Sequence, residues 1–178
     1  MIILVGPSAS GKTAIALELT KTFGFKKFVT TTTREKRKNE VDNVDYHFVS
    51  LDEFLNKIKN NEFIEYVKYN DNYYGSEKKE VDRNKVIILE PQGLKHFLDE
   101  HNKTFVSFYI TCDPLIREKR MIERGDEKKD IDKRLLNDIF VFDDSLRDIV
   151  DFTIDSSSLN VKALAKTIYF LYLSKINN

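Results

Sequence analysis

The 178-residue chain has one cysteine, no tryptophan, no net charge and no long apolar run. The single cysteine, Cys112, rules out a disulfide within the chain and favours a reducing, cytoplasmic location. Lys and Arg together number 29, as do Asp and Glu, so bulk charge gives no support for binding to nucleic acid or to a membrane surface. The missing tryptophan accompanies abundant lysine, asparagine and isoleucine, which we interpret as genomic base composition rather than function.

We expect no membrane-spanning segment or signal peptide from this sequence. No apolar run approaches the roughly 20 residues of a membrane-spanning helix. Residues 1–5 are too few for the apolar region of a signal peptide and have no basic start. Hydrophobic residues make up 41% of the chain and charged residues 33%, which is typical of a globular protein with about one domain.

The most informative segment is Gly6–Thr13, which matches G-x-x-x-x-G-K-[ST] at every fixed position. We expect an apolar strand before it at 1–5 and a helix after it at 14–23, the usual context of a phosphate-binding loop. Loop amides and the helix N-terminus together form an anion site. We therefore predict that a nucleoside triphosphate contacts Gly6, Pro7, Ser8, Ala9, Ser10, Gly11, Lys12 and Thr13. The Thr13 hydroxyl would also bind Mg²⁺.

The rest of the chain alternates between apolar strands and helical patterns. Strands are predicted at 2–5, 86–89, 105–110 and 152–154, and helices at 92–100, at 115–123 and from Val161 onward. One long helix is expected to bury Ile131, Leu135, Ile139, Phe142 and Leu146. This alternation predicts an α/β fold with a doubly wound parallel sheet.

Two stretches interrupt the alternation. In the first, residues 30–75, a capping-box pattern at Ser50–Glu53 predicts a helix start. Short strands are expected around that helix at 28–33, 46–49, 63–69 and 73–74, which makes a small α+β insertion. The second stretch, residues 115–136, is helical and rich in Arg and Lys. A core with two insertions is typical of an enzyme that closes over two ligands.

The first insertion carries polar side chains that suit a second ligand. Arg34 and Arg37, together with Tyr46 and Tyr74, can converge on a phosphate, whose oxygens match guanidinium groups in geometry. The carboxylate of Glu65 offers two adjacent acceptors. Guanine presents matching N1–H and N2–H₂ donors, and adenine presents neither. A site of this kind can reject adenine by about 10⁴-fold.

With these residues identified, the chain resembles the guanylate kinases over nearly its whole length. Beyond the phosphate loop, the similarity is densest at 32–41, 45–50, 61–65 and 72–76. The resemblance implies phosphoryl transfer to GMP from ATP, with Mg²⁺ as cofactor. It implies that the GMP phosphate is held by Arg34, Arg37, Tyr46 and Tyr74, and the base by Thr30, Glu65, Ser76 and Glu90. It also implies one domain with a core (1–29, 77–113 and 137–178), a GMP-binding insert (30–76) and a helical lid (114–136).

The basic stretch Lys119–Gly125 is similar to the lid helix of that family, and Arg134 fits an arginine beyond it. The resemblance implies that charge around the transferred phosphoryl group comes from Lys12, Arg37, Arg120, Arg124 and Arg134. Asp155 falls near the expected adenine, where many members have asparagine. The expected nucleophile is an oxygen of the GMP phosphate, which is already anionic, so no general base is required.

Two positions depart from the family pattern. Ile88 stands where a core strand of the family has its first aspartate, and Glu90 stands where it has the second. Metal anchoring is then left to Thr13, water and the phosphates, with Glu90 as a further candidate. Two alternatives stay open: a related kinase with another acceptor, such as ribose 1,5-bisphosphate, and a non-catalytic guanylate-kinase-like binding module. We expect ATP and GMP as ligands, no nucleic acid or membrane partner, and a monomer or homodimer.

Overall fold

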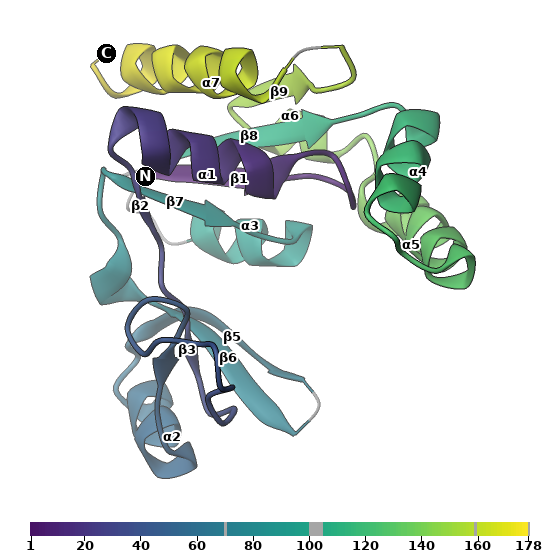
Figure 1. Cartoon of the computed structure of the whole chain (residues 1–178). Coiled ribbons are helices and arrows are strands. Elements are labelled where there is room, and N and C mark those ends of the chain that lie inside the picture. Colours follow the sequence, from purple (N-terminus) through teal and green to yellow (C-terminus); the bar gives the residue numbers. More distant parts are fainter. Residues whose placement is uncertain (70, 100–104, 159, 178) are drawn as a thin grey trace.

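A computed structural model describes residues 1–69, 71–99, 105–158 and 160–177. Its strands form two separate sheets (Figure 1). The larger sheet has the order β2-β7-β1-β8-β9 and is parallel throughout. Its strands are β1 (Ile2–Val5), β2 (Lys26–Lys27), β7 (Lys85–Ile88), β8 (Val106–Thr111) and β9 (Phe152–Asp155). The predicted doubly wound parallel sheet is therefore confirmed.

Helices cover both faces of this sheet because its central strand is apolar on both sides. Ile2 and Leu4 of β1 point to one face, where α1 (Lys12–Phe23) and α7 (Val161–Ile176) pack. Ile3 and Val5 point to the other face, where α3 (Pro91–Asp99) and α6 (Leu146–Ile149) pack. Figure 1 shows these two helical layers with the sheet between them. The predicted end of α3 at Glu100 lies outside the described residues.

The smaller sheet is built from the first insertion and has the order β4-β3-β6-β5. Its strands are β3 (Thr31–Thr32), β4 (His47–Phe48), β5 (Phe63–Tyr69) and β6 (Asn72–Glu77), and the helix α2 (Leu51–Lys59) packs on it. Phe54 of α2 is fully buried and stacks on Phe63 with ring centroids 4.4 Å apart. The predicted capping box is present at Ser50 and Glu53. We call this sheet with α2 the second module; Figure 1 shows it standing apart from the large sheet.

The segment that connects the two sheets is not the single strand predicted at 28–33. Only Thr31–Thr32 pairs in the second module, while Lys26–Lys27 pairs with β7 in the large sheet. Phe28 packs in the core of the large sheet instead of continuing a strand. One extended segment therefore serves both sheets and links them. A short 3₁₀ helix, η1 (Lys78–Glu80), leads back from the second module to β7.

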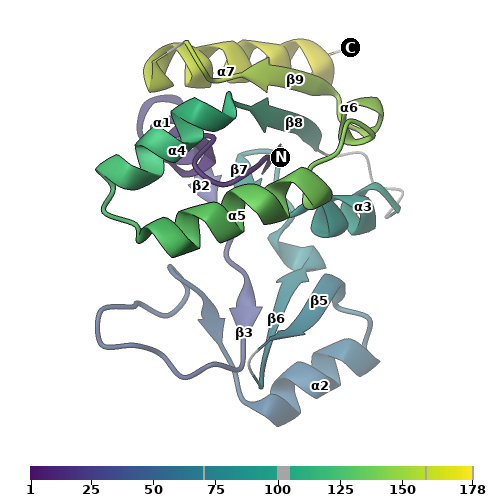
Figure 2. The same ribbon diagram turned by 90° about the vertical axis from the view of Figure 1, so that its right-hand side faces the viewer.

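The basic stretch forms two helices, α4 (Pro114–Glu123) and α5 (Lys128–Val141), beside the phosphate loop (Figure 2). Gly125 follows α4 with φ +87°, which agrees with the predicted helix stop. The predicted continuous helix through Leu146 is wrong, because α5 ends at Val141 and Leu146 opens the separate helix α6. Ile139, expected inside, is 67% exposed. The inward position belongs to Asp138, because the neighbour on that side is the polar phosphate loop rather than an apolar core.

Glu77 joins three elements of the second module. Its carboxylate, 1% exposed, accepts from the Thr31 hydroxyl of β3 and lies 2.9 Å from Lys57 Nζ of α2 and 2.8 Å from Lys79 Nζ. Burial alone would raise the pKa of Glu77, but hydrogen bonds from Lys79, Thr31 and Lys57 outweigh burial and lower the pKa from 4.5 to about 2. The ionised carboxylate is therefore a structural centre of this module.

Replacing Glu77 by glutamine should lower the free energy of unfolding at pH 7 by up to about 3 kcal/mol. Because the folded-state pKa is depressed, the contribution of this carboxylate is full above pH 4.5 and is lost as the pH falls toward 2. Urea unfolding of the wild type and Glu77→Gln at several pH values should show a gap that narrows in acid. The exposed Glu35→Gln is the control, and a gap independent of pH would contradict the assignment.

Candidate active site

The phosphate loop lies between β1 and α1, at the carboxyl edge of the parallel sheet. Gly6 is required there by close approach, because a Cβ on it would lie 2.3 Å from the carbonyl oxygen of Ile110 in β8. Ala9 and Gly11 have φ of +57° and +95°, and α1 begins directly afterwards at Lys12. The loop thus curls around a helix N-terminus, which is the geometry of an anion site.

Lys12 folds back over its own loop. Its ammonium donates to the carbonyl of Pro7 at 2.8 Å and to the carbonyl of Gly6. Burial lowers the pKa of Lys12 below its ordinary value, while the negative charges of Glu90 and Asp138 act in the opposite direction. The same neighbourhood raises the pKa of Glu90, chiefly through burial, with Lys12 opposing. Glu90, which follows β7 after Leu89, therefore lies within electrostatic range of Lys12.

A cavity of about 470 Å³ lies beside the end of the loop and is lined by residues of α1 and β7. Thr13, Thr30 and Ile88 all line it, so the structure brings these three predicted positions together. Ile88 is 37% exposed and offers no oxygen to a metal. Among the described residues there is also no cluster of three or more His, Cys, Asp or Glu that could hold a metal ion.

The second module gathers the other predicted ligand residues. Glu65 on β5 pairs across the strands with Ser76 on β6, whose hydroxyl donates to Glu65 Oε1 at 2.6 Å. The rings of Tyr46 and Tyr74 lie 6.1 Å apart, and the Arg34 guanidinium sits 5.4 Å from the Tyr46 ring centroid. Because these side chains come from four separate segments, only the sheet pairing could bring them together.

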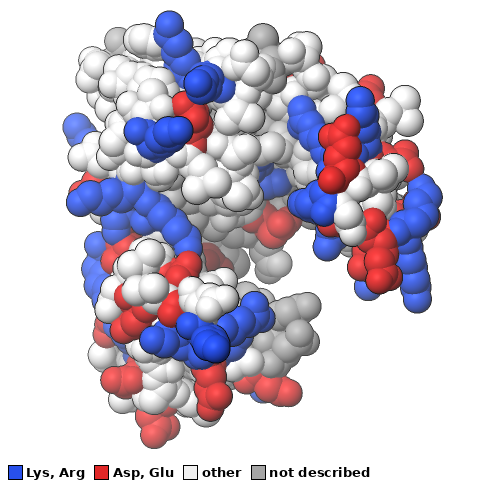
Figure 3. Space-filling model, viewed as in Figure 1, with Lys and Arg blue, Asp and Glu red and all other residues white. Residues whose placement is uncertain are grey.

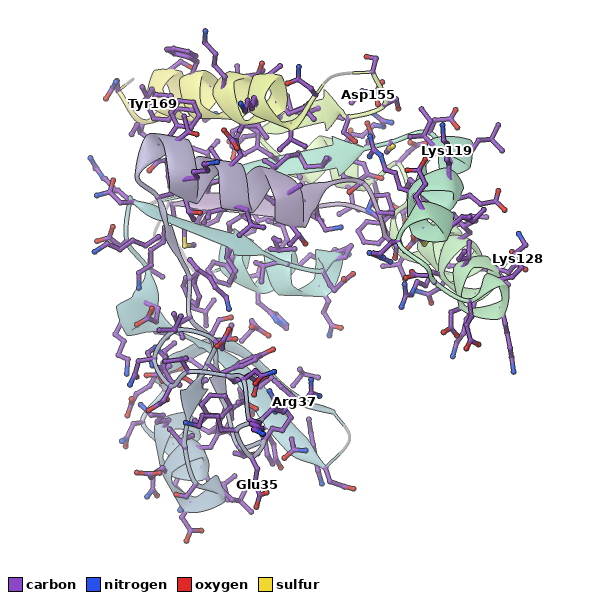
Figure 4. The ribbon with its side chains drawn as sticks, viewed as in Figure 1. Glu35, Arg37, Lys119, Lys128, Asp155 and Tyr169 are labelled. Atoms are coloured by element: carbon purple, nitrogen blue, oxygen red, sulfur yellow. The ribbon has the colours of Figure 1, made fainter. Side chains whose placement is uncertain are left out.

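Arg34 and Arg37 are both tied to Glu40. Arg34 Nη2 lies 2.7 Å from Glu40 Oε1, and the backbone N–H of Arg37 donates to Glu40 Oε2 at 2.9 Å. The hydrogen bond between the Arg34 and Glu40 side chains is the main cause that raises the pKa of Arg34 and lowers the pKa of Glu40. The side chain of Arg37, labelled in Figure 4, is exposed.

The predicted arginines of the basic helices fall into two groups. Arg124 and Arg134 both bind the carboxylate of Asp126, and hydrogen bonding to Arg124 is the main cause that lowers the pKa of Asp126. Arg120 points instead to the back of the phosphate loop, where it donates to the carbonyls of Ala9 at 3.2 Å and Ser156 at 2.8 Å. All three arginines contact protein acceptors in this structure.

Asp155 lies at the carboxyl end of β9, on the same edge as the phosphate loop (Figure 4). Its carboxylate accepts from the backbone N–H and hydroxyl of Ser157 at 3.0 and 2.6 Å. The surface is hollowed between the large sheet, the second module and the α4–α5 pair, and Lys and Arg side chains border this hollow (Figure 3). The candidate site thus has three walls, each carrying part of the predicted residue set.

Comparison with known proteins shows the family to which the chain belongs. The family model described as guanylate kinase matches residues 1–168. The chain belongs to the guanylate kinase family. It is 35% identical over 136 residues to the guanylate kinase of Clostridium tetani, an alignment that covers 73% of this chain and 65% of that protein. The Wolinella succinogenes guanylate kinase is 32% identical over 146 residues, covering 77% of this chain and 68% of that protein.

Solved structures show the same fold. The guanylate kinase of Anaplasma phagocytophilum matches with a TM-score of 0.69 at 24% identity, covering 98% of this chain and 85% of that one. The YorR protein of Bacillus subtilis, solved in complex with phosphorylated GDP, matches with a TM-score of 0.54 at 19% identity and covers 100% of this chain and 99% of that one. In this guanylate kinase family member, no described helix is both long and apolar enough to cross a bilayer.

The structure adds residues that sequence reasoning missed. Arg117 and Asp138 form a buried pair beside Ser8, and the Ser156 hydroxyl donates to the Ser10 carbonyl at 2.7 Å. Asp138 did carry a signal, because it is a charged residue within the predicted buried face of a helix. Arg117 and Ser156 carried none, since basic and hydroxyl side chains are common on helix and loop surfaces.

Gly6→Ala should weaken nucleotide binding by the predicted phosphate loop of this guanylate kinase family member. The new Cβ would press on the Ile110 carbonyl, a backbone atom that cannot move aside, so the loop must shift. We expect at least a tenfold weaker affinity for MgADP by calorimetry, and a loss of stability of about 1–3 kcal/mol. Gly93→Ala is the matched control, because its nearest neighbour is a Leu89 side-chain carbon at an ordinary 3.4 Å. Wild-type affinity in Gly6→Ala would contradict the role of this contact.

Proposed function

We propose that the protein transfers the γ-phosphoryl group of MgATP to GMP, and to dGMP, to give ADP and the nucleoside diphosphate. One observation carries the proposal: a complete phosphate loop and the Glu65–Ser76 pair belong to separate modules that border one hollow. A phosphate donor and a guanine acceptor could therefore be held at opposite sides of a common space. Phosphoryl transfer needs that arrangement, because catalysis rests on positioning.

The acceptor is recognised through its base and its phosphate. The Glu65 carboxylate would accept from N1–H and N2–H₂ of guanine, and Ser76 already orients that carboxylate. Thr30 and Glu90 would complete the base contacts. The GMP phosphate would lie against Arg34, Arg37, Tyr46 and Tyr74. Arg34 would exchange part of its contact with Glu40 for the phosphate.

The donor is held by the loop, with Asp155 beside the adenine. Thr13 is the protein ligand we propose for Mg²⁺, with the nucleotide phosphates and water completing its shell. This fits the preference of Mg²⁺ for few protein ligands and several waters, and it needs no carboxylate at Ile88. When bound, the ion neutralises charge on the phosphates. Glu90 acts electrostatically on Lys12 and is the carboxylate that we propose to support the ion's water shell.

In the reaction, an oxygen of the GMP phosphate bonds to the γ-phosphorus as the bond to the β–γ bridging oxygen breaks. Lys12 would leave the carbonyls of Gly6 and Pro7 and bind the transferred group. Positive charge would further come from Arg37, Arg120, Arg124 and Arg134. For this, the proposed lid (114–136) and GMP-binding insert (30–76) must close on the core, because these charges lie on three separate walls.

The deciding experiment is a coupled ADP-release assay with MgATP against GMP, dGMP, AMP, UMP, CMP and ribose 1,5-bisphosphate. The proposal expects turnover with GMP and dGMP and little with the other acceptors. Turnover with ribose 1,5-bisphosphate would favour the related kinase, for which Ile88 and Glu90 leave room. ATP binding without any turnover would favour a non-catalytic module.

The setting of this reaction is also proposed. We place the enzyme in purine nucleotide metabolism in the cytoplasm, a location that the lone, reduced Cys112 supports. Its ligands would be small nucleotides, with no nucleic-acid or membrane partner, and it would act as a monomer or homodimer. The boundaries of the core, insert and lid given above belong to the same proposal.

Lys12→Ala should reduce kcat by at least about 10³-fold while leaving the fold intact. The ammonium offers charge to the transition state, and its hydrogen bonds to described residues go to two carbonyls of its own loop. The measurement is ADP release together with thermal unfolding. A variant that keeps wild-type turnover, with an unchanged melting temperature, would remove Lys12 from the mechanism.

Glu65→Gln should raise the KM for GMP by about 10²-fold and leave the KM for ATP within about twofold. The neutral amide offers one acceptor and turns a donor toward the guanine donors, a mismatch of the kind that costs most in a buried site. Glu62→Gln is the control, because its carboxylate binds Lys57 instead of Ser76. Equal losses for both substrates would contradict base reading by Glu65.

A further inference from the structure

Five consecutive carbonyls of the phosphate loop, from Gly6 to Ser10, accept from side chains. Lys12 serves the first two, and the next three are served from outside the loop. The donors to Ser8, Ala9 and Ser10 are Arg117 at 3.3 Å, Arg120 at 3.2 Å and Ser156 at 2.7 Å. In a trans peptide the N–H points opposite to the carbonyl. The donors that hold the Ser8 and Ser10 carbonyls therefore turn the N–H groups of Ala9 and Gly11 away from themselves, as an anion nest requires. The N–H of Ser10 donates within the loop, to the Pro7 carbonyl at 3.2 Å.

Ser8 is held more completely than its neighbours. Its N–H donates to Asp138 Oδ2 at 3.0 Å, its hydroxyl to Asp138 Oδ1 at 3.4 Å, and its carbonyl accepts from Arg117. Arg117 Nη1 and Asp138 Oδ2 are 2.6 Å apart, and both side chains are about 5% exposed. Every polar group of Ser8 thus meets one buried ion pair, which comes from α4 and α5.

The Arg117–Asp138 pair contributes little to stability, but it fixes the directions of the hydrogen bonds that it makes. Burying two charges costs desolvation energy that their attraction does not reliably recover, and apolar replacement of both is often neutral. A carboxylate and a guanidinium do, however, fix the direction of several hydrogen bonds at once. The next residue, Ala9, has φ +57°, a conformation that a non-glycine residue keeps only when its neighbours hold it.

We propose that Asp138 and Arg117 are positioning residues for ATP, which hold Ser8 so that the loop amides face the phosphates. The inference rests on the proposed binding of ATP by this loop. It gives the α4–α5 pair two functional ends. The end at Arg117 and Asp138 is attached to the loop, whereas the guanidinium groups of Arg124 and Arg134 at the other end are about half exposed and bind Asp126.

A purely electrostatic role of Asp138 predicts the opposite effect on nucleotide affinity from a positioning role. If Asp138 acted only as a negative charge near the phosphates, its removal would tighten nucleotide binding. A positioning role forecasts weaker binding instead, even when the net charge is kept. The double variant Arg117→Leu/Asp138→Ala removes one charge of each sign, so it tests position without changing net charge.

The experiment measures the affinity for MgADP by calorimetry, the KM for GMP and the melting temperature. We expect the double variant to melt within a few degrees of wild type, to bind MgADP at least tenfold more weakly, and to keep its KM for GMP within twofold. Lys128→Leu/Asp132→Ala is the matched control, because that pair lies on α5 with both side chains more than half exposed. It should leave MgADP affinity unchanged. Wild-type affinity in the folded Arg117→Leu/Asp138→Ala variant would overturn the proposal.

If the double variant does not fold, single variants decide. Asp138→Asn keeps an oxygen for the Ser8 N–H, and Asp138→Ala does not. The proposal expects affinity for MgADP to fall in the order wild type, Asp138→Asn, Asp138→Ala, and equal affinity in all three would overturn it. MgADP binding needs no acceptor. A wild-type protein that binds MgADP but does not phosphorylate GMP would therefore refute the proposed function and leave this inference standing.

Discussion

The contact between Gly6 and the Ile110 carbonyl is the constraint on which the site depends. It lets the chain turn out of β1 directly against β8, so that the phosphate loop sits at the centre of the parallel sheet. Because parallel strands end at one edge, Glu90 beyond β7 and Asp155 at the end of β9 arrive at the same edge as the loop. A Cβ at Gly6 would press on the Ile110 carbonyl and force the phosphate loop out of this position.

Most cations of the candidate site share one condition in this structure: except for the exposed guanidinium of Arg37, they are bound to an acceptor of the protein itself. The pairs are Lys12 with loop carbonyls, Arg34 with Glu40, and Arg124 and Arg134 with Asp126. In the proposed function, nucleotide binding would be an exchange of partners, and its net free energy would be smaller than the sum of the new contacts.

Membership of the guanylate kinase family is consistent with a site assembled from three walls. The large sheet supplies the phosphate loop, the second module supplies Glu65, Ser76 and two tyrosines, and α4–α5 supply arginines. Glu77 stabilises the second module from within, and the Arg117–Asp138 pair fixes α4–α5 to the loop. The second module is thus stabilised from within, whereas the α4–α5 pair is also attached to the phosphate loop.

The sequence by itself determined the phosphate loop, the parallel sheet and the start of α2, because these depend on local spacing: Gly6 to Thr13, continuous apolar strands, and Ser50 with Glu53. The tertiary structure alone decided where α5 ends and why Asp138 faces inward, since that depends on which neighbour covers the helix. It also decided that Arg120 meets the back of the loop while Arg124 and Arg134 meet Asp126. Helical periodicity gives the face of a residue, but its partner is set by packing between segments far apart in the chain.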